Sequence, residues 1–463
     1  MERVSTGNAR LDLVLGGGLV ADAITLLVGA PGTGKTILAE QCLFATATRE
    51  RPGLYLATVS EPYDKLLRYG QSLEFFDTST IGSSVFYEDL GGALHEQGLG
   101  DVLERVDALV KQHRPGIVVI DSFKALKAFA ADEAEFRRFL HDLAGRFTVL
   151  AVTSLWVGEY ELRDTMESPE FAVADSVIAL ETKRVAERSV RYLSVRKLRG
   201  SDFLSGDHAY RLTAAGLKVF PRIAESLDRA SYSTSPERHS TGIAALDEAL
   251  EDGYWRGSAT VIVGPTGAGK TLMGLHFLYA GARLGEPGIL LSLQENRTQL
   301  ARIVERFGWS FDDPMITVMD ASPIDVYVDE LVYGLLDLID TVGARRVVVD
   351  SLDDLSAASP DRTRLNELVY SVAQRCAHRG VSVMFTHETV ELFRITRLSE
   401  YGISHLADNV ILLQHLRDGA RMKRVLSVLK TRGSTNTTSV REFKIARDGI
   451  TLGEPVDLDA LVN

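Results

Sequence analysis

One pattern of glycines, a lysine and a threonine occurs twice in this chain and constrains its fold more than any other feature. The copies are Gly29-Ala-Pro-Gly-Thr-Gly34-Lys35-Thr36 and Gly264-Pro-Thr-Gly-Ala-Gly269-Lys270-Thr271. Both match the phosphate-binding loop, in which glycines let backbone N–H groups converge on phosphate oxygens. Each copy follows an apolar run and precedes a helical pattern, which is the setting that such a loop requires. The chain therefore contains two predicted nucleotide-binding sites.

The spacing of each loop assigns roles to its residues. The lysine ammonium would reach the β- and γ-phosphates, and the threonine hydroxyl, from Thr36 or Thr271, would ligate Mg²⁺. The residues predicted to bind the nucleotide are Gly29, Gly32, Thr33, Gly34, Lys35 and Thr36 in the first copy, and Gly264, Thr266, Gly267, Ala268, Gly269, Lys270 and Thr271 in the second.

The duplication extends beyond the loops. Ser5-Thr6-Gly7 recurs as Ser240-Thr241-Gly242, and this spacing (240 − 5) equals that of the two loop lysines (270 − 35), 235 residues. The chain of 463 residues is long enough for two domains, each with its own core. We expect domains at residues 1–224 and 239–463, with residues 225–238, rich in serine and charge, as a linker.

Composition narrows the class of protein. The formal charge of −12 disfavours a permanent nucleic-acid surface, and 45% hydrophobic residues is ordinary for a globular protein. Cys42 and Cys376 are expected to be buried or incidental thiols, and no Cys/His cluster has metal-ligand spacing. Because there is no signal peptide before the first repeat and no long uncharged apolar run, we expect a cytoplasmic protein that makes no membrane contact.

Apolar strands alternate with amphipathic segments in each half, which predicts an α/β fold with a mostly parallel sheet flanked by helices. Each phosphate loop should then lie at the carboxyl end of the first of these strands. The predicted strands are 23–28, 54–59, 116–120, 148–153, 176–180 and 192–197 in the first half, and 259–263, 288–293, 346–349, 381–386, 409–413 and 425–430 in the second.

Two further acidic elements suit nucleotide chemistry. Asp121 and Asp350 end apolar runs, as in a Walker B strand, where the carboxylate holds Mg²⁺ through its water shell. An aspartate that merely caps a turn is the alternative, but the upstream loop in both copies favours the metal site.

Glu61 and Glu295 follow the next strand after each loop. With that strand beside the phosphate strand, each glutamate would orient the attacking water, although a solvent-exposed glutamate at a strand end is the alternative.

With these motifs, the chain resembles the KaiC family within the RecA-like ATPases. The resemblance also rests on Leu15-Gly-Gly-Gly18, on the Lys-x-Arg-Gly segments that begin at Lys197 and Lys430, and on Arg441-Glu-Phe443. It spans residues 4 to 450. It implies tandem RecA-like P-loop NTPase domains that use ATP and Mg²⁺, and a two-tiered homohexameric ring with ATP at the subunit interfaces. Lys197, Arg199, Lys430 and Arg432 match the family's basic pairs, which reach the γ-phosphate of the adjoining subunit; solvated charges at a strand end are the alternative.

The chain departs from the family pattern in three places. Ser60-Glu61 and Gln294-Glu295 keep one carboxylate where the clock proteins have two. Ser404-His405 stands at the position of a Ser-Thr phosphorylation pair, so we expect at most single-site autophosphorylation on Ser404, which could equally be a cap or turn hydroxyl. The short tail also leaves no room for a long partner-binding extension, and we expect no timekeeping role.

Three functions are compatible with these features. The favoured one is an ATP-hydrolysing oligomer that reports its state to a signalling partner, with autokinase activity in its second domain as an added expectation. A recombinase or helicase motor acting on DNA is disfavoured by the acidic charge. The third is a scaffold that binds ATP with little turnover.

Overall fold

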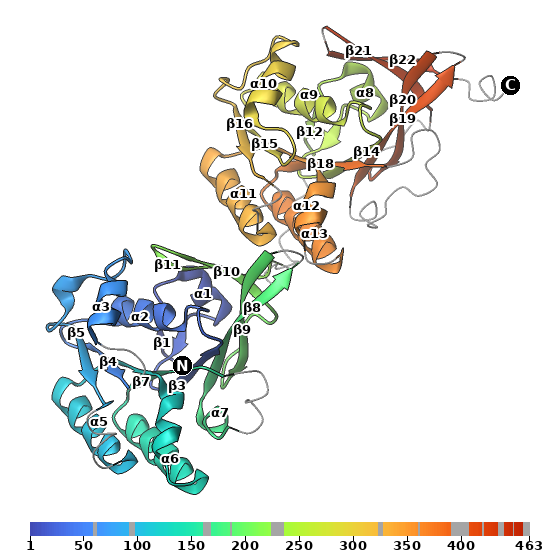
Figure 1. The fold of residues 1–463 in the computed structure, drawn as a ribbon. Helices are drawn as coiled ribbons and strands as arrows, with labels where there is room; N and C mark the ends of the chain where they lie inside the picture. The colour runs from blue at the N-terminus through green and yellow to red at the C-terminus, as the bar shows by residue number, and fades with distance from the viewer. Residues whose placement is uncertain are drawn as a thin grey trace. The chain divides into compact units, whose positions relative to one another are not determined.

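The computed structural model divides into two compact units, Met1–Glu225 and Ser226–Asn463. The structure describes residues 1–58, 63–91, 98–160, 168–185, 188–223, 236–322, 327–359, 362–389, 407–418, 421–433, 439–447 and 449–456. The division falls at the start of the expected linker, most of which lies outside these residues. Each unit is a helix-flanked sheet (Figure 1).

The elements of the first unit follow the expected alternation of strands and helices. They are β1 (Arg3–Val4), α1 (Ala9–Val14), β2 (Leu19–Val20), β3 (Ile24–Gly29), α2 (Lys35–Thr46), β4 (Gly53–Ala57), α3 (Tyr63–Gly70), η1 (Thr78–Thr80), β5 (Val85–Asp89), α5 (Leu99–His113), β6 (Ile117–Asp121), η2 (Phe123–Phe129), α6 (Glu133–Val149), β7 (Thr153–Gly158), α7 (Glu170–Val173), β8 (Ser176–Val185), β9 (Arg188–Leu198), β10 (His208–Thr213) and β11 (Gly216–Phe220).

The second unit repeats this order. Its elements are β12 (Arg238–His239), α8 (Ala244–Ala249), β13 (Tyr254–Trp255), β14 (Ala259–Gly264), α9 (Lys270–Ala282), β15 (Gly288–Ser292), α10 (Arg297–Glu305), β16 (Ile316–Asp320), α11 (Val328–Val342), β17 (Arg346–Asp350), α12 (Leu352–Ala358), α13 (Arg362–His378), β18 (Ser382–Glu388), β19 (Asn409–Asp418), β20 (Arg421–Thr431), β21 (Arg441–Ala446) and β22 (Gly449–Pro455).

The two main sheets have the same topology. Within the described residues each has nine strands, in the order β5-β4-β6-β7-β3-β8-β9-β10-β11 in the first unit and β16-β15-β17-β18-β14-β19-β20-β21-β22 in the second. The strands from β5 to β8 are parallel, and β8 to β11 pair antiparallel. The predicted α/β fold with tandem, mostly parallel sheets is therefore confirmed, and an antiparallel extension is added to each sheet.

The central strand β3 shows why the sheet is covered on both faces. All six of its residues are buried, which is typical of a parallel strand between two helical layers. Since successive side chains of a strand point to opposite faces, Leu26 packs in one core with α5 and α6, and Leu27 packs in the other with α1 and α2. Figure 1 shows these two pairs of helices on opposite sides of the first sheet.

One predicted strand is wrong, and several strands were not predicted. Residues 148–153 form the end of α6 and the turn after it, and the strand β7 begins at Thr153. Phe136, Leu140, Leu143 and Phe147 are buried at helical spacing, so the apolar run belongs to the helix. The strands of the two main sheets that were missed lie at sheet edges or in the antiparallel extension, where polar residues interrupt the apolar runs: β5, β10, β11, β16, β21 and β22. The two-residue strands β1, β2, β12 and β13, which form two small separate sheets, were not predicted either.

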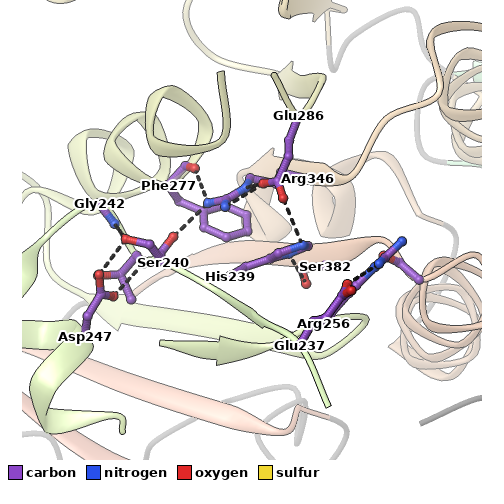
Figure 2. A network of polar contacts seen from close by, with 12 residues as sticks. Glu237, His239, Ser240, Gly242, Asp247, Arg256, Phe277, Glu286, Arg346 and Ser382 are labelled. Carbon is purple, nitrogen blue, oxygen red and sulfur yellow. Dashed lines mark hydrogen bonds and ion pairs between the residues drawn. The ribbon is translucent and has the colours of Figure 1, made fainter. Parts of the chain in front are cut away.

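A network of polar contacts joins His239 and Ser240, at the start of the second unit, to Arg346 in its core (Figure 2). Arg346, the first residue of β17, has 0% exposure and donates to the carbonyl oxygens of Ser240 (2.7 Å) and Phe277 (2.8 Å). Its guanidinium also pairs with Glu286 at 2.7 Å. His239 lies beside the same carboxylate, 3.7 Å away, and contacts the hydroxyl of Ser382 at 2.9 Å.

Within the described part of the chain, no helix combines the length and apolar character needed to cross a membrane.

Candidate functional site

Both phosphate loops connect the carboxyl end of a central strand to the first turn of a helix. The first loop leaves β3 at Gly29 and enters α2 at Lys35, and Gly34 caps that helix with a left-handed φ of 91°. This left-handed backbone favours glycine at position 34, where a Cβ atom would also lie 2.6 Å from the Leu212 side chain. Gly269 repeats this conformation (φ 105°) before α9. Helix N-terminal amides and a glycine-rich loop together form an anion-binding site.

The two loop lysines fold back over their own loops. The Nζ atom of Lys35 donates to the carbonyl oxygen of Ala30 at 2.9 Å, and that of Lys270 donates to Gly264 and Pro265 at 2.9 and 3.0 Å. Burial lowers the pKa of both lysines, and nearby carboxylates oppose the shift. Each ammonium is thus held at the mouth of its loop by acceptors that a phosphate could replace.

The predicted magnesium ligands meet in both units. The hydroxyl of Thr36 donates to Oδ2 of Asp121 at 2.7 Å, and Thr271 makes the same contact with Asp350 at 2.6 Å. A hydroxyl and one carboxylate beside a phosphate loop are the oxygen donors that suit Mg²⁺, which keeps much of its water shell. Among the described residues, no group of three or more His, Cys, Asp or Glu side chains could hold a metal by itself. The threonine and the aspartate therefore fit a metal ion that is bound together with a phosphate group.

The predicted catalytic glutamates are less completely described. Glu61 lies outside the described residues. Glu295 follows β15 and is half-buried; burial first, and the charge of Asp350 second, raise its pKa. The expectation that the strand before each glutamate lies beside the phosphate strand is wrong in both units. Strands β17 and β18 separate β15 from β14, and β6 and β7 separate β4 from β3. Ser292, at the end of β15, instead pairs with Asp350, whose charge acts on Glu295.

The basic pairs lie at the opposite edge of each sheet from the loops. Arg199 bonds through its backbone N–H to Asp175, whose own N–H bonds to Ile24, the first residue of β3. Lys197 donates to the carbonyl oxygen of Phe171 at 2.9 Å. Burial lowers the pKa of Lys197, and the adjacent guanidinium adds to the shift. Neither cation is therefore placed at its own phosphate loop.

The second unit repeats that arrangement. Arg432 bonds to Asp408, which bonds to Ala259 at the start of β14, and Lys430 donates to Ala407 at 2.6 Å. The pKa of Lys430 is lowered, mainly by burial.

Comparison with known proteins decides the family. A family model described as "ATPase: KaiC" matches residues 4–224 and again residues 239–457.

The chain belongs to the KaiC ATPase family.

Its curated relatives include circadian clock protein KaiC3 of Synechocystis sp., 28% identical, with 98% of this chain and 92% of the relative aligned. Circadian clock oscillator protein KaiC 1 of the same organism is 28% identical over 97% of this chain and 88% of its own length. The clock oscillator protein KaiC of Picosynechococcus sp. is 27% identical, at 97% and 89% coverage. The resemblance inferred from the motifs is therefore confirmed, and it extends over nearly the whole chain.

The position that aligns with a KaiC-type phosphorylation pair is not among the described residues. Ser404 and His405 both fall in the gap before residue 407. The prediction that Ser404 accepts phosphate therefore stays a prediction.

The structure adds functional candidates that sequence reasoning missed. A cavity of about 1040 Å³ in this KaiC-family chain is lined by the first phosphate loop together with Glu40, Tyr55, Lys124 and Glu159. Glu159 directly follows β7, the strand next to β3, and its charge acts on Lys35.

Glu388 occupies the matching place in the second unit. It pairs with Gly264 across β14 and β18 and accepts a hydrogen bond from the hydroxyl of Thr266 in the loop. In both copies an acidic residue lies at the end of the strand after the Walker B strand. This repeated position could have identified Glu159 and Glu388 from the sequence.

Proposed function

We propose that both units bind ATP with Mg²⁺ and hydrolyse it. The observation that carries this proposal is the paired contact of a loop threonine with a Walker B aspartate, 2.7 Å in the first unit and 2.6 Å in the second. The contact joins the threonine hydroxyl and the aspartate at the N-terminus of a helix that a glycine-rich loop precedes, and this supports binding of Mg²⁺ there. Membership of the KaiC ATPase family supports the same activity.

The residues divide the work of phosphoryl transfer to water. Backbone amides of the loop and the ammonium of Lys35 or Lys270 would hold the phosphates and neutralise their charge. Thr36 with Asp121, and Thr271 with Asp350, would hold Mg²⁺, which would supply positive charge that stabilises the phosphates. Glu295 would orient the attacking water in the second unit, and Glu388 is the structural alternative at the other side of the loop. We propose Glu61 and Glu159 for the same tasks in the first unit.

The basic pairs support a shared site. Because Lys197 and Arg199 lie at the opposite edge of the sheet from their own loop, we propose that they act on ATP held by a neighbouring copy. Lys430 and Arg432 would do so in the second tier. Cations supplied from a neighbour stabilise the charge of the transition state. The assembly proposed from this geometry and from the family is a homo-oligomer, in the form of a hexameric ring, whose nucleotide state is read by a protein partner.

One incubation tests the activity. The full-length protein receives Mg²⁺ and γ-labelled ATP, and both released phosphate and protein-bound label are followed. We expect the wild type to release phosphate, Lys35→Ala and Lys270→Ala each to lose part of the rate, and the double variant to lose all of it. Phosphate release that persists in the double variant would overturn the proposal. Label kept on the wild type but absent from Ser404→Ala would add autokinase activity; no bound label would withdraw it.

A further inference from the structure

The Walker B aspartate of each unit accepts a second hydroxyl, and the donor comes from a different flanking strand in each. In the first unit the donor is Tyr55 of β4, whose OH lies 3.0 Å from Oδ2 of Asp121. In the second unit it is Thr386 of β18, which donates to Oδ1 of Asp350. The Walker B strand lies between these flanking strands in both sheets, so its aspartate can be reached from either side.

The strand registers show that each unit has replaced the donor of the other. Leu290 stands where Tyr55 does, two residues before the partner of the Walker B aspartate. Val157 pairs directly with Asp121 and stands where Thr386 does. The hydroxyl has therefore changed strands between the two copies while its acceptor has stayed the same.

The side chain of Tyr55 is held in place by its surroundings. It has 0% exposure, and its ring centroid lies 5.0 Å from that of Tyr87 on the next strand. The hydroxyl of Tyr87 donates in turn to Glu40 of α2 at 3.2 Å. At the matching positions the second unit has Val318 and Leu275, both apolar. The first unit thus carries a polar layer behind its magnesium donors that the second unit lacks.

We propose that Tyr55 is a positioning residue for the metal-binding carboxylate of the first unit. The inference rests on the proposed binding of ATP with Mg²⁺. Thr36 bonds to the same oxygen of Asp121, but its hydroxyl is itself a magnesium donor and would turn to the metal. Tyr55 has no such second task, so its hydrogen bond keeps Asp121 oriented when Thr36 leaves. A hydrogen-bond partner behind a metal ligand commonly accounts for 10- to 100-fold in metal affinity.

The test is the binding of Mn²⁺, which is visible by electron paramagnetic resonance, to the full-length chain loaded with ADP. A Lys270→Ala background removes the second site, so that the first is measured alone. We expect Tyr55→Phe to weaken Mn²⁺ binding by about 10-fold or more, with ADP binding in the absence of metal unchanged. Adding Val157→Thr to Tyr55→Phe should restore the affinity, because it supplies a hydroxyl from the strand that the second unit uses.

Tyr87→Phe is the matched control, since it removes a tyrosine hydroxyl from the same layer without touching the Asp121 contact. Unchanged Mn²⁺ affinity in Tyr55→Phe, or an equal loss in Tyr87→Phe, would overturn the role of Tyr55. If the Lys270→Ala parent itself bound no Mn²⁺ with ADP, the proposed function of the first unit would fail, and the role of Tyr55 with it.

Discussion

The hydroxyl of Tyr210 donates a hydrogen bond of 2.6 Å to the carbonyl oxygen of Thr33, in the middle of the first phosphate loop. Tyr210 lies on β10, in the antiparallel extension, and is fully buried. The extension therefore supports the loop from the side away from the parallel strands. Phe443 occupies the matching place on β21, so the second loop lacks this bond.

Removing that hydroxyl should weaken the first unit. We expect Tyr210→Phe to lower its free energy of unfolding by about 1 kcal/mol, since a buried carbonyl loses its partner. Amide hydrogen exchange of the full-length chain, read in each variant from peptides of the unit that carries the substitution, measures the loss. Tyr254→Phe is the control, because the Tyr254 hydroxyl is buried with no hydrogen-bond partner among the described residues. Its removal should be neutral or stabilising; equal losses in the two variants would argue against the Tyr210 contact.

The second unit should lose stability in mild acid through His239. Burial first, and the charge of Arg346 second, lower the pKa of this histidine to about 4. Glu286 opposes the shift, and Arg256 and Glu237 also act on the ring. Because the unfolded chain binds a proton near pH 6.5 and the folded chain does not, stability falls as the pH drops from about 6.5 to about 4. The full loss is roughly 3 kcal/mol.

The measurement is the free energy of unfolding of the second unit at several pH values, again by hydrogen exchange. His239→Gln should flatten the curve between pH 6.5 and 4. A curve of unchanged slope in this variant would exclude His239 as its source.

The stability of the second unit should depend on the ion pair between Arg346 and Glu286. Because the guanidinium is fully buried, Glu286→Ala would leave a charge without its carboxylate, and we expect a loss of about 3 kcal/mol or more in unfolding free energy. Glu248→Ala, an exposed acid on α8, is the control and should stay within about 0.5 kcal/mol. Chemical denaturation followed by hydrogen exchange compares the two. A small effect of Glu286→Ala would mean that water reaches the Arg346 site.

Two carboxylates compete for the role of orienting water in the second unit. We expect Glu295→Gln to lower kcat about 100-fold or more without changing ATP affinity, whereas Glu388→Gln should act less strongly. Both are measured in a Lys35→Ala background. Because the pKa of Glu295 is raised, activity should fall with decreasing pH already above the usual range of a glutamate. A larger loss in Glu388→Gln would assign the water to that residue instead.

Mixing two inactive chains tests whether sites are shared. With the first unit silenced by Lys35→Ala, one chain carries Lys270→Ala and the other carries Lys430→Ala with Arg432→Ala. We expect part of the ATPase rate to return on mixing, because an intact loop and an intact basic pair can then meet across an interface. No recovery, with mixed assemblies shown to form, would mean that the basic pair does not act on a neighbour.

Local patterns predicted much of this protein. The phosphate loops, the Walker B strands and the central apolar strands are each a short continuous segment. Their patterns depend only on neighbouring residues, so they could be recognised without knowing the fold. The wrong strand prediction at residues 148–153, where the structure has the end of a helix, shows the limit of local patterns. A short apolar run suits either a helix or a strand until packing decides between them.

Tertiary structure decided which distant residues meet. Strand order placed β15, which precedes Glu295, beside the strand of Asp350 rather than beside β14. It also placed Lys197 beside the first residues of β8, at the end of the parallel strands away from the loop. Strand order together with register brought Tyr55 to Asp121, and Thr386 to Asp350. These contacts join strands that are adjacent only after the sheet forms, and a tyrosine in an apolar strand has no local mark that names its partner. The sequence by itself determined the tandem α/β fold and the two glycine-rich loops, and the pairing of distant strands determined which residues surround those loops.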